Sequence, residues 1–248
     1  MTTRTAKPLR PAAVARLLLV ALILVTATQA GAASAHPTSA EAASTQQLAA
    51  LLSAHEAYSA ASLSSRRLGL VQATRPLTGE QTVLPVVGQA AGHTGHGWLD
   101  VNLPGRPNGH TGWIQQSGTR TEATPWRLVV DTATRQVSVY QNNRRVRTFI
   151  AIVGKPSTPT PRGHFFVEEA IQLPADAVGA PYALALSARS DALQTFDGGP
   201  GQIALHGLDN VGGTLGTAAS HGCIRLADAT MRWLITRIGP GVPVSIIR

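Results

Sequence analysis

The sequence contains one cysteine, few charged residues and no nucleic-acid-binding pattern. Cys223 stands alone among 248 residues, which excludes an internal disulfide framework and any zinc or iron–sulfur site built from several cysteines. Charged residues make up 14% of the chain and hydrophobic residues 44%, a balance too apolar for a disordered protein. Aromatic and basic residues do not interleave as they do in single-strand binders, so we expect no nucleic-acid partner.

The formal net charge of +8 overstates how basic the working protein is. Four of the basic residues lie in the first sixteen positions, whereas all thirteen acidic residues lie beyond position 40. Removing that N-terminal segment lowers the net charge to +4. A weakly basic protein of this kind suits a mildly polyanionic environment.

Residues 1–35 have the three regions of a secretory signal peptide. A basic start is followed by the apolar run 17–28 and by Ala33-x-Ala35. The apolar run is shorter than the roughly 20 residues of a membrane-spanning helix. We therefore predict cleavage near His36 and an exported protein of the cell wall or another extracytoplasmic site. The membrane would be met only through this segment, and a retained signal anchor is the alternative.

The next two segments predict a linker and a small module. Residues 36–65 are rich in Ala and Ser and are interpreted as a linker, with room for a short helix over Thr45–Leu63. Residues 66–120 hold strand-sized apolar runs broken by Gly and Pro, which predicts a small β-barrel of about five strands. The run WLDVNLPGRPNGHTGWI resembles bacterial Src-homology-three-like modules, whose ligand the sequence does not indicate. Three loop histidines here lack a fourth metal ligand and are interpreted as surface residues: His93, His96 and His110.

Residues 126–248 predict a larger domain that packs separately from the module and is joined to it near Glu122–Pro125. Short apolar runs, some alternating with polar residues, indicate seven or eight strands in a mainly β domain of sandwich or barrel type. Asn142-Asn143 predicts a hairpin turn between two of these strands. One helix is predicted, capped by Asp228 and ended by Gly239-Pro240. Its apolar face consists of Met231, Leu234, Ile235 and Ile238.

The residues that carry chemistry are concentrated between positions 203 and 226. A predicted strand delivers His206-Gly207, and a glycine-rich loop then leads to Ser220-His-Gly-Cys223-Ile-Arg-Leu. A nucleophilic cysteine needs a base, usually His, and backbone N–H groups directed at the developing oxyanion. A lone cysteine in an exported protein is either reactive or a small buried hydrophobe. The neighbours of Cys223 favour the reactive interpretation.

The pattern H-G followed by S-H-G-C-I-R-L resembles the L,D-transpeptidase (YkuD-like) catalytic domain over residues 126–248. The loop Pro159–Gly163 and the glycine-rich segment 207–216 fit the same resemblance. The resemblance implies that Cys223 is the nucleophile and His206 the general base. It also implies an oxyanion hole built from the backbone amides of three successive residues: His221, Gly222 and Cys223.

Three further residues take supporting or substrate-binding roles in this resemblance: Ser220, Gly207 and Arg225. Gly207 stands where some relatives have Ser, and we expect it to serve because that position acts through its backbone carbonyl. Arg225 could bind a substrate carboxylate, and a structural salt bridge to an acid such as Asp228 is equally open.

The resemblance implies an exported enzyme that acts on peptidoglycan. Cys223 would form a thioester with a donor stem peptide, release a terminal D-amino acid and pass the acyl group to an amine of an acceptor stem peptide. No cofactor or metal is required, and the oligomeric state is not predicted. An L,D-carboxypeptidase and a non-catalytic wall-binding module are the alternatives.

Two chemical rivals are less favoured. A zinc site formed by His206, His221 and Cys223 would lack a general-base Glu nearby. A sortase-like cysteine transpeptidase would have Thr before the cysteine and a base far upstream, whereas here Gly222 precedes Cys223 and His206 is close.

Overall fold

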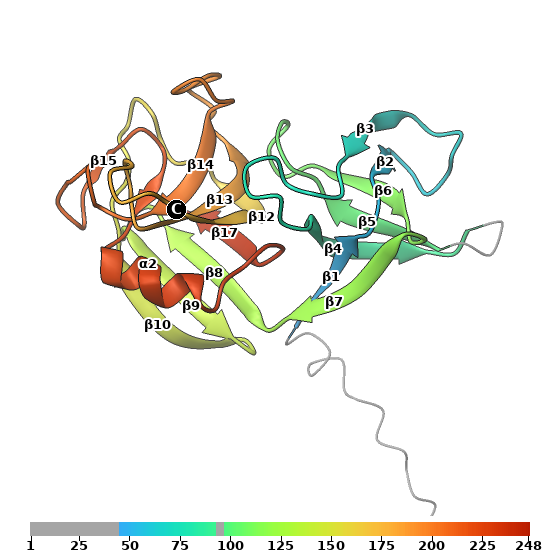
Figure 1. The fold of residues 1–248 in the computed structure, drawn as a ribbon, viewed down its shortest axis with the longest axis horizontal. Coiled ribbons are helices and arrows are strands. Elements are labelled where there is room, and N and C mark those ends of the chain that lie inside the picture. Colours follow the sequence, from blue (N-terminus) through green and yellow to red (C-terminus); the bar gives the residue numbers. More distant parts are fainter. Residues whose placement is uncertain (1–44, 93–96) are drawn as a thin grey trace, which may run out of the picture. The chain divides into compact units, whose positions relative to one another are not determined.

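The computed structural model describes residues 45–92 and 97–248, which belong to one compact unit. The predicted signal peptide, the start of the linker, His93 and His96 lie outside the described residues. The described chain is mainly β with a single helix, α2, which confirms the predicted fold class (Figure 1). No helix among these residues is both long and apolar enough to cross a membrane.

Seven strands form the N-terminal module, in the order β3-β2-β6-β5-β4-β1-β7. Their bounds are β1 Gln46–Leu51, β2 His55–Tyr58, β3 Arg67–Val71, β4 Val83–Ala90, β5 Trp98–Asn102, β6 Thr111–Gln115 and β7 Thr119–Thr124. The three apolar runs of the sequence lie in β4, β5 and β6, as predicted. Their inward side chains form the module's core with those of β1.

The linker prediction is wrong for the part that the structure describes. Residues 46–51 and 55–58 are strands, and β1 pairs with both β4 and β7. Small side chains suit β1 to its place between β4 and β7, where Ala49 and Ala50 are almost fully buried. The module therefore begins at Gln46 rather than near residue 66. The junction lies within the predicted range Glu122–Pro125 but is shorter than that range, because β7 extends to Thr124 and only Pro125 separates it from β8.

Eight strands form the sheet of the C-terminal domain, in the order β10-β9-β8-β17-β12-β13-β14-β16. Their bounds are β8 Trp126–Asp131, β9 Gln136–Gln141, β10 Arg144–Ile150, β12 Gly163–Gln172, β13 Tyr182–Arg189, β14 Gln202–His206, β16 Ile224–Arg225 and β17 Pro243–Ile247. A separate two-stranded sheet pairs β11 (Val153–Gly154) with β15 (Ala218–Ser220). The predicted hairpin between β9 and β10 is present, and Asn142 and Asn143 both take positive φ, as a tight turn of this kind requires.

Helix α2 (Asp228–Ile235) packs its apolar face into the core of this domain (Figure 1). Met231 and Leu234 are buried as predicted. The predicted end at Gly239-Pro240 is wrong, because the helix ends at Ile235 and the buried Ile238 lies beyond it. The predicted cap is wrong, since Ala227 precedes the helix and no side chain caps it. The Asp228 carboxylate instead accepts a hydrogen bond of 2.6 Å from the backbone N–H of Leu208. It thereby ties the helix to the segment that follows His206.

The module and the domain share packed surface. Phe166 of β12 is 1% exposed and belongs to the hydrophobic cluster of the module. Beside it, the Glu168 carboxylate forms ion pairs with Arg75 of the module and with Arg189 of β13. Glu169 accepts hydrogen bonds from the backbone N–H and the hydroxyl of Thr78 at 3.0 Å each. These contacts contradict the expectation of two separately packed domains.

Burial makes this charge cluster sensitive to loss of a partner. Desolvation lowers the pKa of the Arg189 guanidinium to about 10, and the nearby positive charge of Arg106 acts in the same direction. Desolvation also lowers the pKa of Arg75, although Glu169 opposes that shift. Both guanidinium groups stay charged near neutral pH and depend on the carboxylates between them.

We expect Glu168→Ala to lower the free energy of unfolding by about 3–5 kcal/mol, because two largely buried guanidinium groups lose their shared carboxylate. Urea unfolding followed by tryptophan fluorescence measures this change. Glu56→Ala is the matched control, since it removes an exposed pair with Arg67 (side chains 32% and 64% exposed). The control should cost less than about 1 kcal/mol. Equal losses for the two variants would contradict a structural role for the cluster.

Candidate active site

The pairing of β14 with β16 brings the predicted nucleophile and base to one face of the sheet. The two strands are parallel, with Leu205 opposite Ile224 and His206 opposite Arg225. Leu205 and Ile224 are fully buried and face the core. Side chains alternate along a strand, so His206 and Arg225 point to the opposite face. Cys223, which precedes β16, is opposite Ala204 by the same register and shares that face.

The distance between Cys223 and His206 follows from this register. Adjacent strands lie about 4.8 Å apart and each residue advances the chain by about 3.3 Å, which places the two Cα atoms roughly 8 Å apart on the diagonal. The imidazole and thiol side chains can span that separation. Both residues are partly exposed, so the face that they share is accessible to a substrate.

Cys223 lies in surroundings that favour the neutral thiol. Its Sγ is 4.0 Å from the carbonyl oxygen of Gln202. Burial raises the pKa of the thiol, while a backbone hydrogen bond from Ala204 and the positive charge of Arg225 oppose the rise. At rest Cys223 is therefore a neutral thiol, which would need a base in order to act as a nucleophile.

His206 is held in the tautomer that a general base requires. Its Nδ1 lies 2.8 Å from the carbonyl oxygen of Gly207. A carbonyl oxygen only accepts hydrogen bonds, so Nδ1 carries the proton and Nε2 keeps its lone pair in the neutral ring. Burial lowers the pKa of His206, which Arg225 reinforces and the bond to Gly207 opposes. The imidazole is thus neutral and able to accept a proton near pH 7.

Gly207 is required by close packing as well as through its carbonyl. Its backbone N–H donates to the carbonyl oxygen of Gly179 at 2.8 Å. A Cβ at this position would come within 2.0 Å of the carbonyl oxygen of Ala180 and 2.6 Å of a carboxylate oxygen of Asp228. A side chain at 207 would therefore displace the carbonyl that holds His206.

Ser220 shapes the turn that carries the nucleophile. It is fully buried, and its hydroxyl donates to the carbonyl oxygen of Cys223 at 2.6 Å while it accepts from the backbone N–H of Gly222 at 3.1 Å. The N–H of Gly222 is thus engaged within the turn, which differs from its predicted place in an oxyanion hole. The amides of His221 and Cys223 are the remaining candidates. Gly222 has φ of +123°, a backbone conformation that favours glycine.

The proline-rich loop 155–161 supports this turn from behind. The backbone N–H of Lys155 and the hydroxyl of Thr158 both donate to the carbonyl oxygen of Ser220, at 3.0 and 3.2 Å. The hydroxyl of Thr160 donates to the carbonyl oxygen of Gly222 at 2.9 Å. Sequence reasoning placed this loop within the resemblance but missed the two buried threonines. The signal in the sequence was Thr158-Pro-Thr-Pro161. The prolines restrict the backbone there, so the two threonine hydroxyls are held in place for hydrogen bonds.

His221 lies at the surface beside the nucleophile. Its ring packs against Phe196, with ring centroids 5.5 Å apart, and its Nε2 is 3.4 Å from Nζ of Lys155. The exposed ring of His221 thus contacts these two side chains, while the backbone of His221 forms part of the turn that carries Cys223. Sequence reasoning identified neither Phe196 nor Lys155 as a neighbour of the site.

Arg225 carries positive charge beside both reactive groups. Its Nη1 donates to the carbonyl oxygen of Gly212 at 3.3 Å. Among residues 45–92 and 97–248 it forms no ion pair with Asp228, whose carboxylate binds the amide of Leu208. The salt-bridge interpretation of Arg225 is therefore not supported.

The zinc alternative also lacks geometric support. No group of three or more potential ligands from His, Cys, Asp and Glu occurs in the part of the chain that the structure describes. His206 uses Nδ1 on a backbone carbonyl, and His221 lies against a lysine.

The neutral thiol and imidazole lead to a pH prediction. Thiolate appears only as the pH rises through the raised pKa of Cys223, so alkylation by iodoacetamide should be slow at neutral pH. The rate should keep increasing above about pH 8.5, the ordinary thiol value. Alkylation quenched at set times and analysed by intact mass gives the rate at each pH. A plateau reached by about pH 7 would indicate a preformed thiolate–imidazolium pair and contradict this account.

Gly207→Ala should disturb the base more than the nucleophile. The added methyl group meets the backbone of Ala180, just before β13, and displaces the carbonyl that binds Nδ1. We therefore expect acylation of Cys223 to fall by at least about 10-fold, a smaller loss than the roughly 10²–10⁴-fold that removal of the base would cause. Gly239→Ala is the matched control, because a Cβ there meets nothing within 4 Å and no positive φ is involved. Equal acylation rates for the two variants would refute the role assigned to Gly207.

Comparison with known proteins bears on this site. The family model for the L,D-transpeptidase catalytic domain, YkuD, matches residues 125–246. A Bacillus licheniformis protein named as the L,D-transpeptidase YkuD is 31% identical over 125 residues, which cover 50% of this chain and 67% of that protein. The Bacillus subtilis (strain 168) protein of the same name is 27% identical over 148 residues, 60% of this chain and 74% of its own length.

Solved structures give a weaker likeness. The Enterococcus faecium L,D-transpeptidase is 21% identical with a TM-score of 0.38, and the match covers 49% of this chain and 49% of that one. The chain thus spans about half the length of that enzyme. The family model and the 31% identical relative coincide on the domain that carries Cys223 and His206. On that evidence, this chain belongs to the YkuD family of L,D-transpeptidases.

Proposed function

We propose that this protein is an exported cysteine transpeptidase that cross-links peptidoglycan stem peptides. The observation that carries the proposal is the shared face of Cys223 and His206, with the Nδ1 proton of the base held by Gly207. The family of the C-terminal domain supports the substrate class. The N-terminal module, for which we propose a Src-homology-three-like role in the wall, precedes that domain.

The residues suggest how the reaction proceeds. His206 Nε2 accepts the thiol proton as Sγ of Cys223 attacks the acyl carbonyl of the donor stem peptide. The carbonyl oxygen becomes an oxyanion, for which the amides of His221 and Cys223 are the candidate donors. The C–N bond to the terminal D-amino acid then breaks, and His206 returns the proton to the departing amine. A thioester on Cys223 remains.

The second half of the reaction reverses these roles. An amine of the acceptor stem peptide attacks the thioester carbonyl while His206 accepts its proton. The C–S bond breaks, a new amide bond forms, and the proton passes to the cysteine sulfur. Attack by water in place of the amine would give the carboxypeptidase reaction.

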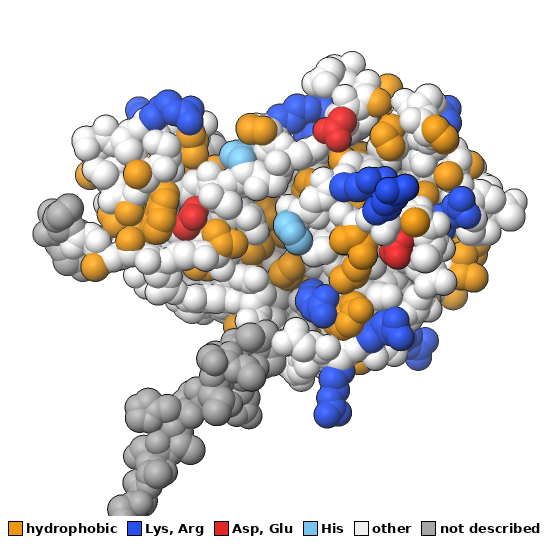
Figure 2. All heavy atoms as spheres, turned by 180° about the vertical axis from the view of Figure 1, so that it is seen from behind, with side chains coloured by type: hydrophobic (Ala, Val, Ile, Leu, Met, Phe, Trp, Pro, Cys, Tyr) orange, Lys and Arg blue, Asp and Glu red, His pale blue; other side chains and the backbone are white. Residues whose placement is uncertain are grey.

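The charge of the domain is consistent with an anionic polymer. Residues 126–248 contain 12 basic and eight acidic residues, and two of the acids, Glu168 and Glu169, are buried. Figure 2 shows one face of the molecule, on which Lys and Arg side chains outnumber Asp and Glu. A groove of about 520 Å³ beside loop 155–161 is lined in part by Arg135 and Arg162. Stem peptides carry free carboxylates that such a surface would attract.

The proposal is tested with a purified stem tetrapeptide as donor and an amine-bearing stem peptide as acceptor. Intact mass of the wild-type protein should show a covalent adduct whose mass is that of the donor peptide without its terminal residue. Mass analysis of the products should show a cross-linked dimer of stem peptides. A hydrolysed tripeptide without dimer would identify a carboxypeptidase instead. No adduct under any condition would favour a non-catalytic wall-binding module.

Variants separate the roles of the three residues. Cys223→Ser should form no adduct, and His206→Ala should acylate roughly 10²–10⁴-fold more slowly. The His206→Ala rate should recover in part at high pH, where the thiol ionises without a base. His221→Ala should lose less, because its backbone amide remains. The assignment of the base is wrong if His221→Ala is the more damaged variant and His206→Ala is near normal at neutral pH.

A further inference from the structure

The loop 190–201 connects β13 to β14 and forms one side of the candidate site. Its end joins Gln202, whose carbonyl oxygen is 4.0 Å from Sγ of Cys223. Its middle places the ring of Phe196, half exposed, against the ring of His221. A shift of this loop would therefore change the wall next to the nucleophile.

Arg106 of the N-terminal module holds the base of this loop. Its guanidinium donates to the carbonyl oxygens of Ser190 and Leu193 at 2.8 and 3.2 Å and to that of Pro200 at 2.9 Å. Ser190 begins the loop and Pro200 lies at its end, so one planar group ties both ends together. A lysine ammonium has no such fork of fixed donors and could not bind all three carbonyls in the same way.

Asn108 forms a second attachment, in which its side-chain amide pairs with the backbone of Arg189 as a neighbouring strand would. Its Oδ1 accepts from the backbone N–H of Arg189 at 2.8 Å, and its Nδ2 donates to the carbonyl oxygen of Arg189 at 2.7 Å. The same Nδ2 donates to the carboxylate of Asp191 at 3.0 Å. The side chain thus fixes the point at which β13 ends and the loop begins.

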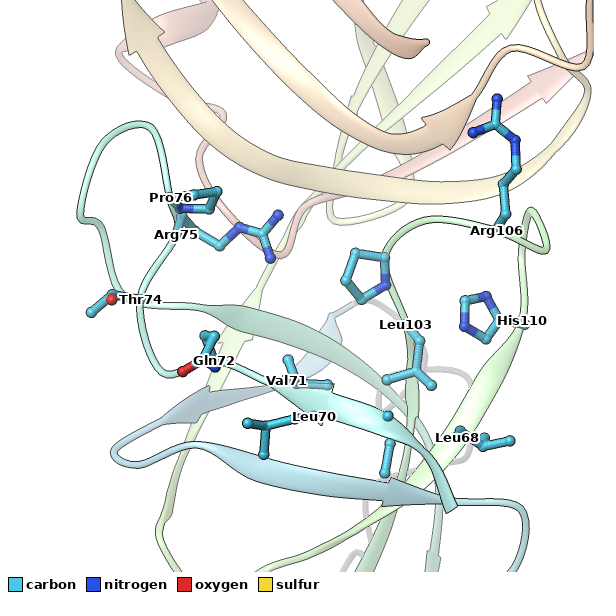
Figure 3. Close-up of a pocket in the computed structure, with 13 residues that line it drawn as sticks. Leu68, Leu70, Val71, Gln72, Thr74, Arg75, Pro76, Leu103, Arg106 and His110 are labelled. Carbon is cyan, nitrogen blue, oxygen red and sulfur yellow. The ribbon is translucent and has the colours of Figure 1, made fainter. Parts of the chain in front are cut away.

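These two residues belong to a turn that the module presents to the domain. The turn lines a groove of about 570 Å³ on the module, together with Leu68, Leu70 and Val71 of β3. Figure 3 shows Arg106 extending from the rim of this groove toward the ribbon of the C-terminal domain. Its donors are used on the loop, so the arginine serves the neighbouring domain rather than the groove.

We propose that Arg106 and Asn108 are positioning residues for the acylation of Cys223. They hold loop 190–201 so that Phe196 and His221 form a fixed wall along which the donor peptide is oriented. Neither residue touches the reacting atoms. This inference rests on the proposed function, and it makes the N-terminal module part of the active-site architecture.

The test compares two reactions of Cys223 in the full protein. Acylation by a stem tetrapeptide or by imipenem needs an oriented substrate, whereas alkylation by iodoacetamide needs only the thiol. Arg106→Lys keeps the charge but loses the fork, so we expect acylation to fall about 10-fold through misplacement of the wall. Alkylation should stay within about twofold of wild type, because it depends on the ionisation of the thiol and not on the orientation of a substrate. Asn108→Ala should show the same division.

Matched controls keep the test decisive. Arg67→Lys is the same substitution at an exposed arginine of the module that pairs with Glu56, and it should leave both rates unchanged. Phe196→Ala removes a half-exposed ring without opening the core and should reproduce the loss of acylation. If Arg106→Lys and Phe196→Ala are acylated at the wild-type rate, this inference is wrong and the proposed function is unaffected. A fall in alkylation that parallels the fall in acylation would have the same meaning. Failure of the wild-type protein to become acylated would overturn the proposed function as well.

Discussion

The parallel pairing of β14 with β16 is the constraint on which the site depends. It joins strands that are separated by the glycine-rich loop and sets His206 opposite Arg225. Because Leu205 and Ile224 are locked in the core, a slip of one residue would bury the polar side chains and expose the apolar ones. The hydrophobic core therefore fixes the register, and the register fixes which side chains share the reactive face.

Hydrogen bonds around this pair then set the protonation states. The carbonyl of Gly207 fixes the imidazole tautomer, and Ser220 closes the turn that presents the thiol. Burial disfavours charge on both groups, which raises the pKa of Cys223 and lowers that of His206. These shifts disfavour a resting ion pair, and under the proposed function the proton would move from Cys223 to His206 during attack. Supports come from three directions: loop 155–161 behind the turn, α2 through Asp228, and the module through Arg106.

Much of this arrangement could be predicted from the sequence where local patterns decide the structure. Alternating apolar residues predicted β9, paired asparagines predicted its hairpin, and the spacing of Met231 and Leu234 predicted the helix face. The dense group of His, Gly and Cys residues indicated the site because nucleophilic chemistry needs those types together. The family model matches residues 125–246, the domain in which that group lies.

The errors arose where tertiary contacts override local preference. β1 is rich in alanine, and only pairing on both sides with β4 and β7 makes it a strand. Asp228 looked like a cap, yet its carboxylate is used on Leu208 across the fold. Arg106 lies in a Gly- and Pro-rich turn, and its partner carbonyls are 84 to 94 positions away, beyond the reach of any local pattern.

A crystal structure of the protein acylated by imipenem tests the central claim most directly. The account predicts a covalent bond from Sγ of Cys223 to the opened lactam carbonyl. His206 should still donate through Nδ1 to Gly207, with Nε2 turned toward the adduct within about 3.2 Å of a polar atom. An adduct on Cys223 with the His206 ring turned away and its Nδ1 bond broken would contradict the proposed pairing of nucleophile and base.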